Sequence, residues 1–175
     1  MPELVRGERF QELFTSFRST AQRLEMRDWY NSPVEREPLR RFLDGNPDPE
    51  WARRPWLQAI RAATAEGRRF QRVRIVSLPL SDYARFGLYG AQANNRAGED
   101  IRYLDREAAI KAGIPQFDVW CFDRTLSAVL HFDAEDGSLL GAELIDDSAL
   151  VTEHCRWFDL AWTLSTSRDE FAARV

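Results

Sequence analysis

The chain has 175 residues, a length typical of one domain with a sizeable core, and 44% of its residues are hydrophobic, which excludes a disordered protein. Its formal net charge of −4 argues against direct nucleic-acid binding, because a nucleic-acid surface usually makes a domain basic. The sequence opens on no charged-then-apolar leader and holds no apolar run of membrane-spanning length. We therefore expect a cytoplasmic protein without membrane contact.

The N-terminal part, residues 1–50, is predicted to contain a helix, an edge strand and a second helix. Apolar residues recur at helical spacing over residues 7–18, and another helix is expected after Pro38. Between them, charged and apolar residues alternate over 23–27, which indicates a half-buried strand with the charges typical of a sheet edge. We expect this part to pack on a main domain at residues 51–175, the two making one structural unit.

The main domain is predicted to be α/β, because helical patterns run directly into strand patterns. Pro55 suits the first turn of a helix, and a strand follows at residues 70–78. In that strand Val73 faces one way, and Arg72 and Arg74 face the other. Further expected elements are a helix at 81–95, a short strand at 101–104 and a helical turn capped by Asp105. Three strands at 117–123, 126–132 and 139–145 follow, with a hairpin turn at 134–137, and a final helix covers 146–165.

Several polar residues of this part favour structural roles. Asp146 and Asp147 stand where they would cap the final helix rather than catalyse a reaction. Cys121 and Cys155 lie in apolar runs, so we expect buried free thiols and no disulfide. The spacing of histidines and cysteines fits no zinc site and no phosphate-binding glycine loop is present, so no metal or cofactor is expected.

Residues 116–123, QFDVWCFD, carry the outline of a known motif. Gln116, Asp118 and Asp123 stand at the offsets of the His, Lys and Asp in phospholipase D-type phosphodiesterases. In those enzymes the His is the nucleophile and the Lys neutralises phosphate charge. Because Gln cannot replace the nucleophile and Asp reverses the needed charge, no phosphodiesterase activity is expected.

The order of elements over residues 51–165 resembles the phospholipase D-like fold, a mixed sheet flanked by helices, and in particular its non-catalytic versions. Those serve as sensor domains in some prokaryotic transcription regulators. Phe158 and Trp162 on the final helix match an F-x-x-x-W face of that fold. The segments VSLPLSDYARFG, AGEDIRYL and FDVWCFD are also similar to an actinobacterial domain family, encoded beside helix-turn-helix regulators, for which no activity is established.

The resemblance implies a non-catalytic regulatory or ligand-binding module, which either senses a small molecule or docks on a helix-turn-helix regulator. It also implies a homodimer, since active enzymes of this fold bring two copies of the domain together. Phe86, Tyr89 and Trp157 fall off the predicted inner stripes and are the candidate interface anchors, unless they cover loops of their own chain.

Two alternatives stay open. One is an enzyme of another chemistry with an acidic and histidine-containing cleft, in which His131 pairs with Asp133 or works beside Asp118 and Asp123. The other is a structural domain for protein–protein docking. Among the basic residues, Arg68 to Arg74 form the densest cluster, which fits either a phosphate or acidic partner or a solvated face.

A ligand site is expected where the strand ends at 75–78 and 122–124 meet the start of the helix at Ser81. The candidate ligand-binding residues are Arg74, Asp82, Tyr83, Arg85, Gln116, Asp118, Asp123, Arg124 and His131.

Overall fold

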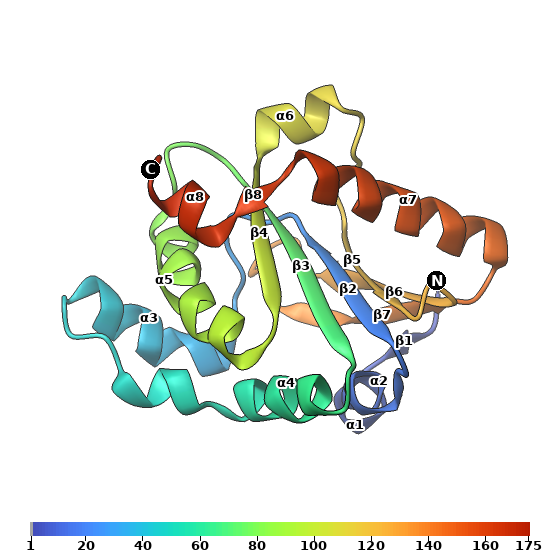
Figure 1. The fold of residues 1–175 in the computed structure, drawn as a ribbon, viewed down its shortest axis with the longest axis horizontal. Helices are drawn as coiled ribbons and strands as arrows, with labels where there is room; N and C mark the ends of the chain where they lie inside the picture. Colours follow the sequence, from blue (N-terminus) through green and yellow to red (C-terminus); the bar gives the residue numbers. More distant parts are fainter. Residues whose placement is uncertain (1) are drawn as a thin grey trace.

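The computed structural model describes residues 2–175 and shows one domain, a mixed eight-stranded sheet with helices on both faces (Figure 1). The strand order is β1-β7-β6-β5-β2-β3-β4-β8. Strands β2, β3 and β4 are parallel, and the other neighbours pair antiparallel. The predicted α/β class with a mixed sheet is confirmed.

The strands are β1 (Leu4–Val5), β2 (Thr20–Glu25), β3 (Arg69–Val76), β4 (Asp100–Asp105), β5 (Asp118–Phe122), β6 (Leu126–Phe132), β7 (Leu139–Ile145) and β8 (Thr166–Ser167). The α-helices are α1 (Gly7–Gln11), α2 (Leu13–Ser16), α3 (Arg36–Leu43), α4 (Pro55–Ala65), α5 (Asp82–Ala97), α6 (Arg106–Lys111), α7 (Ser148–Leu164) and α8 (Arg168–Ala172). Two short 3₁₀ helices, η1 (Pro33–Glu35) and η2 (Pro49–Arg53), flank α3.

The longer helices start and stop as their sequences dictate. Pro55 opens α4, where its missing N–H costs nothing. The Ser81 hydroxyl accepts from the N–H of Ala84 at 3.1 Å and caps α5, which ends at Gly98 with φ of 115°. The Asp147 carboxylate accepts from two N–H groups at the start of α7, as predicted.

The two faces of the sheet differ in chemistry. Beneath α6 and α7 the face is apolar, with Leu24, Val73 and Val119 fully buried against Phe158. The opposite face is apolar only near α1, α2 and α4, where Phe70 and other aromatic rings pack together. Toward the carboxyl ends of β2 and β3 that same face becomes charged. In-register pairing of the two parallel strands produces this change, because it sets Arg23 beside Arg72 and Glu25 beside Arg74.

The strand predicted at a sheet edge lies at the centre instead. β2 is bordered by β5 on one side and β3 on the other, so its alternating charges are buried and do not guard an edge. Residues 1–50 therefore supply a central strand of the same sheet. The helix expected over residues 7–18 is also broken into α1 and α2 at Glu12.

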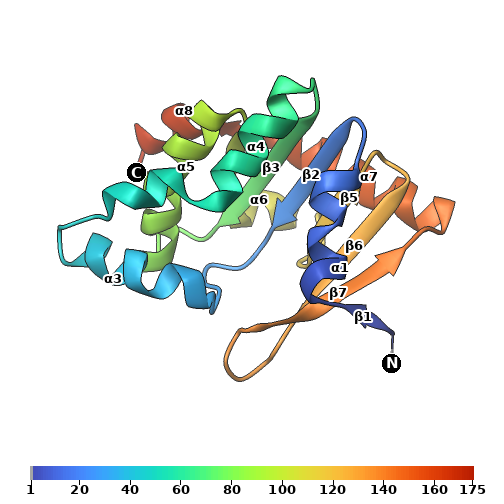
Figure 2. The same cartoon turned by 90° about the horizontal axis from the view of Figure 1, so that it is seen from below.

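The chain between β2 and α4, residues 26–54, is called here the strap. It carries η1, α3 and η2 and runs along α5 before returning to the sheet (Figure 2). Aromatic contacts hold it in place, among them Phe42 on Phe86 and Trp51 on Phe86, with ring centroids 5.7 and 5.6 Å apart. The strap thereby forms one wall above the charged end of the sheet.

Candidate functional site

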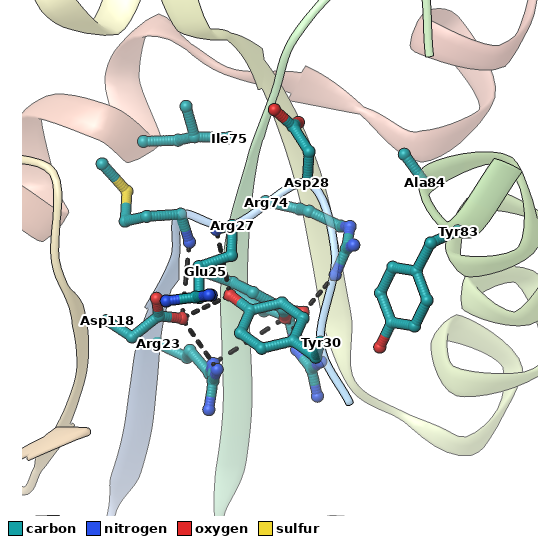
Figure 3. A network of polar contacts seen from close by, with 12 residues as sticks. Arg23, Glu25, Arg27, Asp28, Tyr30, Arg74, Ile75, Tyr83, Ala84 and Asp118 are labelled. Carbon is teal, nitrogen blue, oxygen red and sulfur yellow. Dashed lines mark hydrogen bonds and ion pairs between the residues drawn. The ribbon is translucent and has the colours of Figure 1, made fainter. Parts of the chain in front are cut away.

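A buried group of charged side chains, called here the charged floor, lies on the strap side of the sheet. Its members are Arg23 and Glu25 of β2, Arg72 and Arg74 of β3, Asp118 of β5, and Glu99 before β4. Glu25 is central and only 4% exposed. One of its carboxylate oxygens accepts from Nη1 of Arg74 (Figure 3). The other accepts from Nη1 of Arg72 at 2.8 Å and lies 3.7 Å from Nε of Arg23.

Two further carboxylates complete the floor. Oδ1 of Asp118 accepts from Nη2 of Arg23 at 2.9 Å and from the Tyr30 hydroxyl at 2.5 Å (Figure 3). Glu99, which is 1% exposed, accepts from Nε of Arg72 at 2.8 Å. Three arginines thus face three carboxylates, which offsets the large cost of burying any one of these charges alone.

The pKa values show how strongly the floor holds its charges. Burial opposes the charged form of Glu25, but Arg74, Arg72 and Arg23 outweigh it and lower the pKa of Glu25 to about 2. Burial also opposes the charge of Arg74, yet Glu25 raises its pKa above the ordinary value. For Asp118 the balance reverses, because burial outweighs Arg23 and raises its pKa.

The charged floor lies at the bottom of a cleft between the sheet, the strap and α5. A main hollow of about 510 Å³ is lined mostly by aromatic and aliphatic side chains, including Tyr30, Trp56 and Trp120. A side hollow of about 410 Å³ is lined by Trp51 and Trp56. These volumes lie in the range of small-molecule sites, which are mostly apolar with a few placed polar groups.

A third, inner hollow of about 60 Å³ lies between β3 and α5. Its lining includes Arg54, Arg74 and Tyr103. Glu35 and Arg72 line all three hollows, so the hollows adjoin and form one cleft. The cleft opens at the carboxyl ends of the parallel strands β2 and β3, where ligands bind in many α/β sheets.

Two of the predicted ligand-binding residues lie in this cleft. The Arg74 guanidinium carbon is 5.4 Å from the centroid of the Tyr83 ring, and both residues line the inner hollow. Gln116, Asp118 and His131 line a separate hollow of about 320 Å³, so Asp118 lies between that hollow and the charged floor. Gln116 accepts there from Arg106 at 2.5 Å.

The other predicted site residues lie apart. Asp82 and Arg85 are exposed and pair with each other on α5. Asp123 and Arg124 are at the opposite end of the sheet, because β5 runs antiparallel to β2. The expected meeting of the strand ends at 75–78 and 122–124 is therefore wrong.

Asp123 has a structural role at that far end. Its carboxylate accepts from the backbone N–H groups of Arg18, Ser19 and Thr20 at 2.7 to 3.0 Å. These bonds lower the pKa of Asp123 against the opposing effect of burial. Arg124 pairs with Asp159 at 2.7 Å. Both residues thus join neighbouring segments of the chain.

His131 forms neither of the pairs considered for an enzyme. Its Nε2 lies 3.1 Å from a carboxylate oxygen of Glu143, whereas Asp133 accepts from backbone N–H groups of the following turn. Asp118 pairs across the strands with Leu130, so the next residue, His131, extends from the other face of the sheet.

Other residues singled out in the sequence are used inside the chain. Phe86 is 3% exposed and packs on the strap, and Trp157 packs edge-on against Phe117. Phe86 is therefore no interface anchor, whereas Tyr89 is 43% exposed. Cys121 and Cys155 are buried free thiols, as predicted. Within residues 2–175, no helix is long and apolar enough to cross a membrane.

Sequence reasoning missed most of the cleft. The cleft residues absent from the predicted ligand-binding set are Arg23, Glu25, Tyr30, Glu35, Trp51, Arg54, Trp56, Arg72, Glu99 and Trp120. A signal was present in the alternating charges of β2 and β3, which occupy corresponding positions of two central strands. From the sequence alone, that pattern predicts a sheet edge for β2, and for β3 either a solvated face or a site for a phosphate or acidic partner, because the neighbours of the strands are not visible in it.

Comparison with known protein families gives one match. A family model described as "Domain of unknown function (DUF6879)" matches residues 8–173, nearly the whole chain. No curated protein matches the sequence.

Proposed function

The chain belongs to the DUF6879 family, and we propose that it is a non-catalytic regulatory module that binds a small molecule in the cleft between the strap and the sheet. The observation that carries this proposal is the cleft itself, an aromatic-walled hollow of about 510 Å³ above a floor of paired charges. Such a floor is preorganised, because every arginine on it is held by a carboxylate before a ligand arrives.

The geometry favours binding over the alternative of an enzyme. A catalytic site needs a nucleophile or base within reach of a partner group. Asp118 and His131 line one hollow, but Asp118 is bonded to Arg23 and Tyr30 and His131 lies beside Glu143. Asp123 lies at the opposite end of the sheet and is occupied by backbone N–H groups. The docking alternative would need a large exposed apolar patch, whereas the aromatic residues of the cleft line hollows.

The finer parts of the proposal come from the sequence resemblance. According to that resemblance, the chain is a phospholipase D-like domain without catalytic groups. It acts on a helix-turn-helix regulator in the cytoplasm, and it pairs as a homodimer. Gln116 bonded to Arg106 and Asp118 bonded to Arg23 support the loss of catalysis, since a glutamine amide is not a nucleophile and an aspartate is not a cation.

The ligand-binding part is tested by NMR on protein labelled with ¹⁵N at the tryptophan indoles. Trp51, Trp56 and Trp120 line the cleft, whereas Trp157 and Trp162 lie on α7 beneath the other face and serve as internal controls. A fragment library should contain compounds that shift the first three indole signals and leave the last two unchanged. A library whose hits shift only the α7 signals would contradict the proposed site.

The regulatory part needs a second measurement. A helix-turn-helix regulator encoded beside this chain is mixed with it. Binding of a cleft ligand should then change the affinity of that regulator for its DNA. Fluorescence anisotropy of labelled DNA, with and without the ligand, gives that affinity. Equal DNA affinities under both conditions would contradict a sensor role.

A further inference from the structure

The inner hollow contains hydrogen-bond donors that lack acceptors. Nε and Nη2 of Arg74, a residue 5% exposed, have no partner within residues 2–175, and neither does the hydroxyl of Tyr103. Both residues line the inner hollow. Buried polar groups are paired in the large majority of cases, so three free groups around one hollow need an explanation. A ligand that brings oxygen acceptors would satisfy them.

The charge beside this hollow points the same way. Arg54 is the cleft arginine without a carboxylate at ion-pair distance in the described part of the chain. It donates instead to the Trp51 carbonyl at 2.6 Å and to Oδ1 of Asn94. Burial and the nearby Arg72 lower the pKa of Arg54 to about 10, so its positive charge is only partly compensated. An added negative charge would be stabilised there.

Two carboxylates also face the inner hollow and must be weighed. Glu25 is occupied by Arg72 and Arg74 and adds no free negative charge. Glu35 accepts from the Tyr83 hydroxyl at 2.5 Å and has no arginine partner among the described residues. Glu35 therefore opposes an anion, and it provides a test of the sign of the ligand charge.

Size decides which part of a ligand enters which hollow. A cavity needs roughly 10 to 15 Å³ to hold one water molecule. The inner hollow of about 60 Å³ therefore has room for a carboxylate or phosphate group but not for a ring. The side hollow of about 410 Å³ shares Trp51, Arg54 and Asn94 with the inner one and has room for a ring.

We propose that the cleft takes an acidic ligand. Its carboxylate or phosphate oxygens enter the inner hollow and accept from Arg54, Arg74 and Tyr103. Its apolar, preferably aromatic, body lies against Trp51 and Trp56. This inference rests on the proposed ligand-binding function and adds the chemical class of the ligand.

The test uses four probes of similar shape and different charge on the full chain. Benzoate and phenyl phosphate are anions, benzamide is neutral, and benzamidine is a cation. We expect at least one of the anions to shift the Trp51 and Trp56 indole signals with a Kd at least tenfold below that of benzamide. The better of the two anions identifies the acidic group. Benzamidine should shift neither signal at the same concentration.

Variants separate charge from general damage. Arg54→Gln should weaken binding of the better anion at least tenfold, whereas Arg53→Gln, next to it but exposed and paired with Glu50, should not. Glu35→Gln should tighten anion binding several-fold by removing the opposing charge. Gly87→Ala places a methyl 3.5 Å from Nε of Arg74, an ordinary contact that fills space beside the guanidinium, and should weaken binding without unfolding the protein.

The outcomes distinguish the two levels of the proposal. Binding of benzamide or benzamidine at Trp51 and Trp56 as tight as that of the anions overturns the acidic class and leaves the ligand-binding cleft standing. Weaker anion binding in Glu35→Gln also overturns the acidic class. No shift of the cleft indoles by any probe, together with no hit in the fragment library, overturns both.

Discussion

Glu25→Gln is the sharpest test of how the charged floor is built. The substitution keeps the size of the side chain and removes the charge that Arg72 and Arg74 share. The glutamine amide also directs two donors toward guanidinium groups that themselves only donate. The variant should therefore lose stability although it leaves no cavity.

The pKa of Glu25 gives the magnitude. It falls from the ordinary value of 4.5 to about 2, and each tenfold change in proton affinity is worth about 1.4 kcal/mol, so the charge contributes about 3 kcal/mol. Removal of one partner of a buried ion pair typically costs about 3–5 kcal/mol, which agrees. For a chain of this length, we expect the melting temperature to fall by roughly 6–12 °C.

Urea unfolding followed by tryptophan fluorescence measures the loss directly. Glu37→Gln is the matched control, because Glu37 pairs with Arg40 on the surface at 2.6 Å and both side chains are exposed. The control should unfold like the wild type. A Glu25→Gln variant within about 1 kcal/mol of the wild type would show that the floor is not held by this carboxylate.

Two of the four other predictions come from particular contacts, and two come from the sequence resemblance. Acid should destabilise the fold as pH falls from about 4.5 through 2, because the pKa of Glu25 is lower in the folded than in the unfolded chain, so that the unfolded chain binds the proton first. Urea unfolding midpoints measured at several pH values test this. The midpoint of Glu25→Gln should depend less on pH over this range. Gly98→Ala should cost about 1–3 kcal/mol in the same assay, because φ is 115° and the new methyl would lie 2.3 Å from Oγ1 of Thr64. Phosphodiester substrates should not be turned over, and turnover that disappears in His131→Ala would contradict the loss of catalysis. Light scattering at micromolar concentration should give about twice 20.3 kDa for the proposed homodimer, and a mass near 20 kDa would exclude it under those conditions.

Local signals in the sequence were sufficient for most elements. The caps at Ser81, Asp105 and Asp147 and the three strands of the β5–β7 meander follow from turn residues and alternation, which act over a few residues. The position of a strand within the sheet depends on partners far along the chain. β2 pairs with residues about 50 and 100 positions away, so its own sequence could not show that it is central.

The same limit explains the errors at the site. Asp118 begins β5 and Asp123 follows its last residue, and no local pattern shows that the two ends of β5 face different neighbours. Trp51 and Arg54 line the cleft from the strap, a segment whose sequence has no strong helix or strand periodicity. Arg74 and Tyr83 were found because a strand end next to a helix start is a local feature.

The choice of basic residues fits binding at this site. Lys111 is the only lysine beside 23 arginines, and the positive charges of the floor are all arginine. A planar guanidinium can bond two carboxylates at once, as Arg72 does with Glu25 and Glu99, and it keeps its charge when buried. A lysine there would tend to lose its proton on burial.

Proton affinities in the cleft also separate binding from acid–base chemistry. A general acid or base works best with a pKa near the working pH. In the cleft, the neighbouring arginines lower the pKa of Glu25 to about 2 against the effect of burial, and Glu25 in turn raises the pKa of Arg74. Burial raises the pKa of Tyr83 and lowers that of Arg54 to about 10. Near pH 7 Glu25, Arg54 and Arg74 therefore stay charged and Tyr83 stays neutral. Fixed charges of this kind can orient and bind a charged ligand, which supports the proposed binding role.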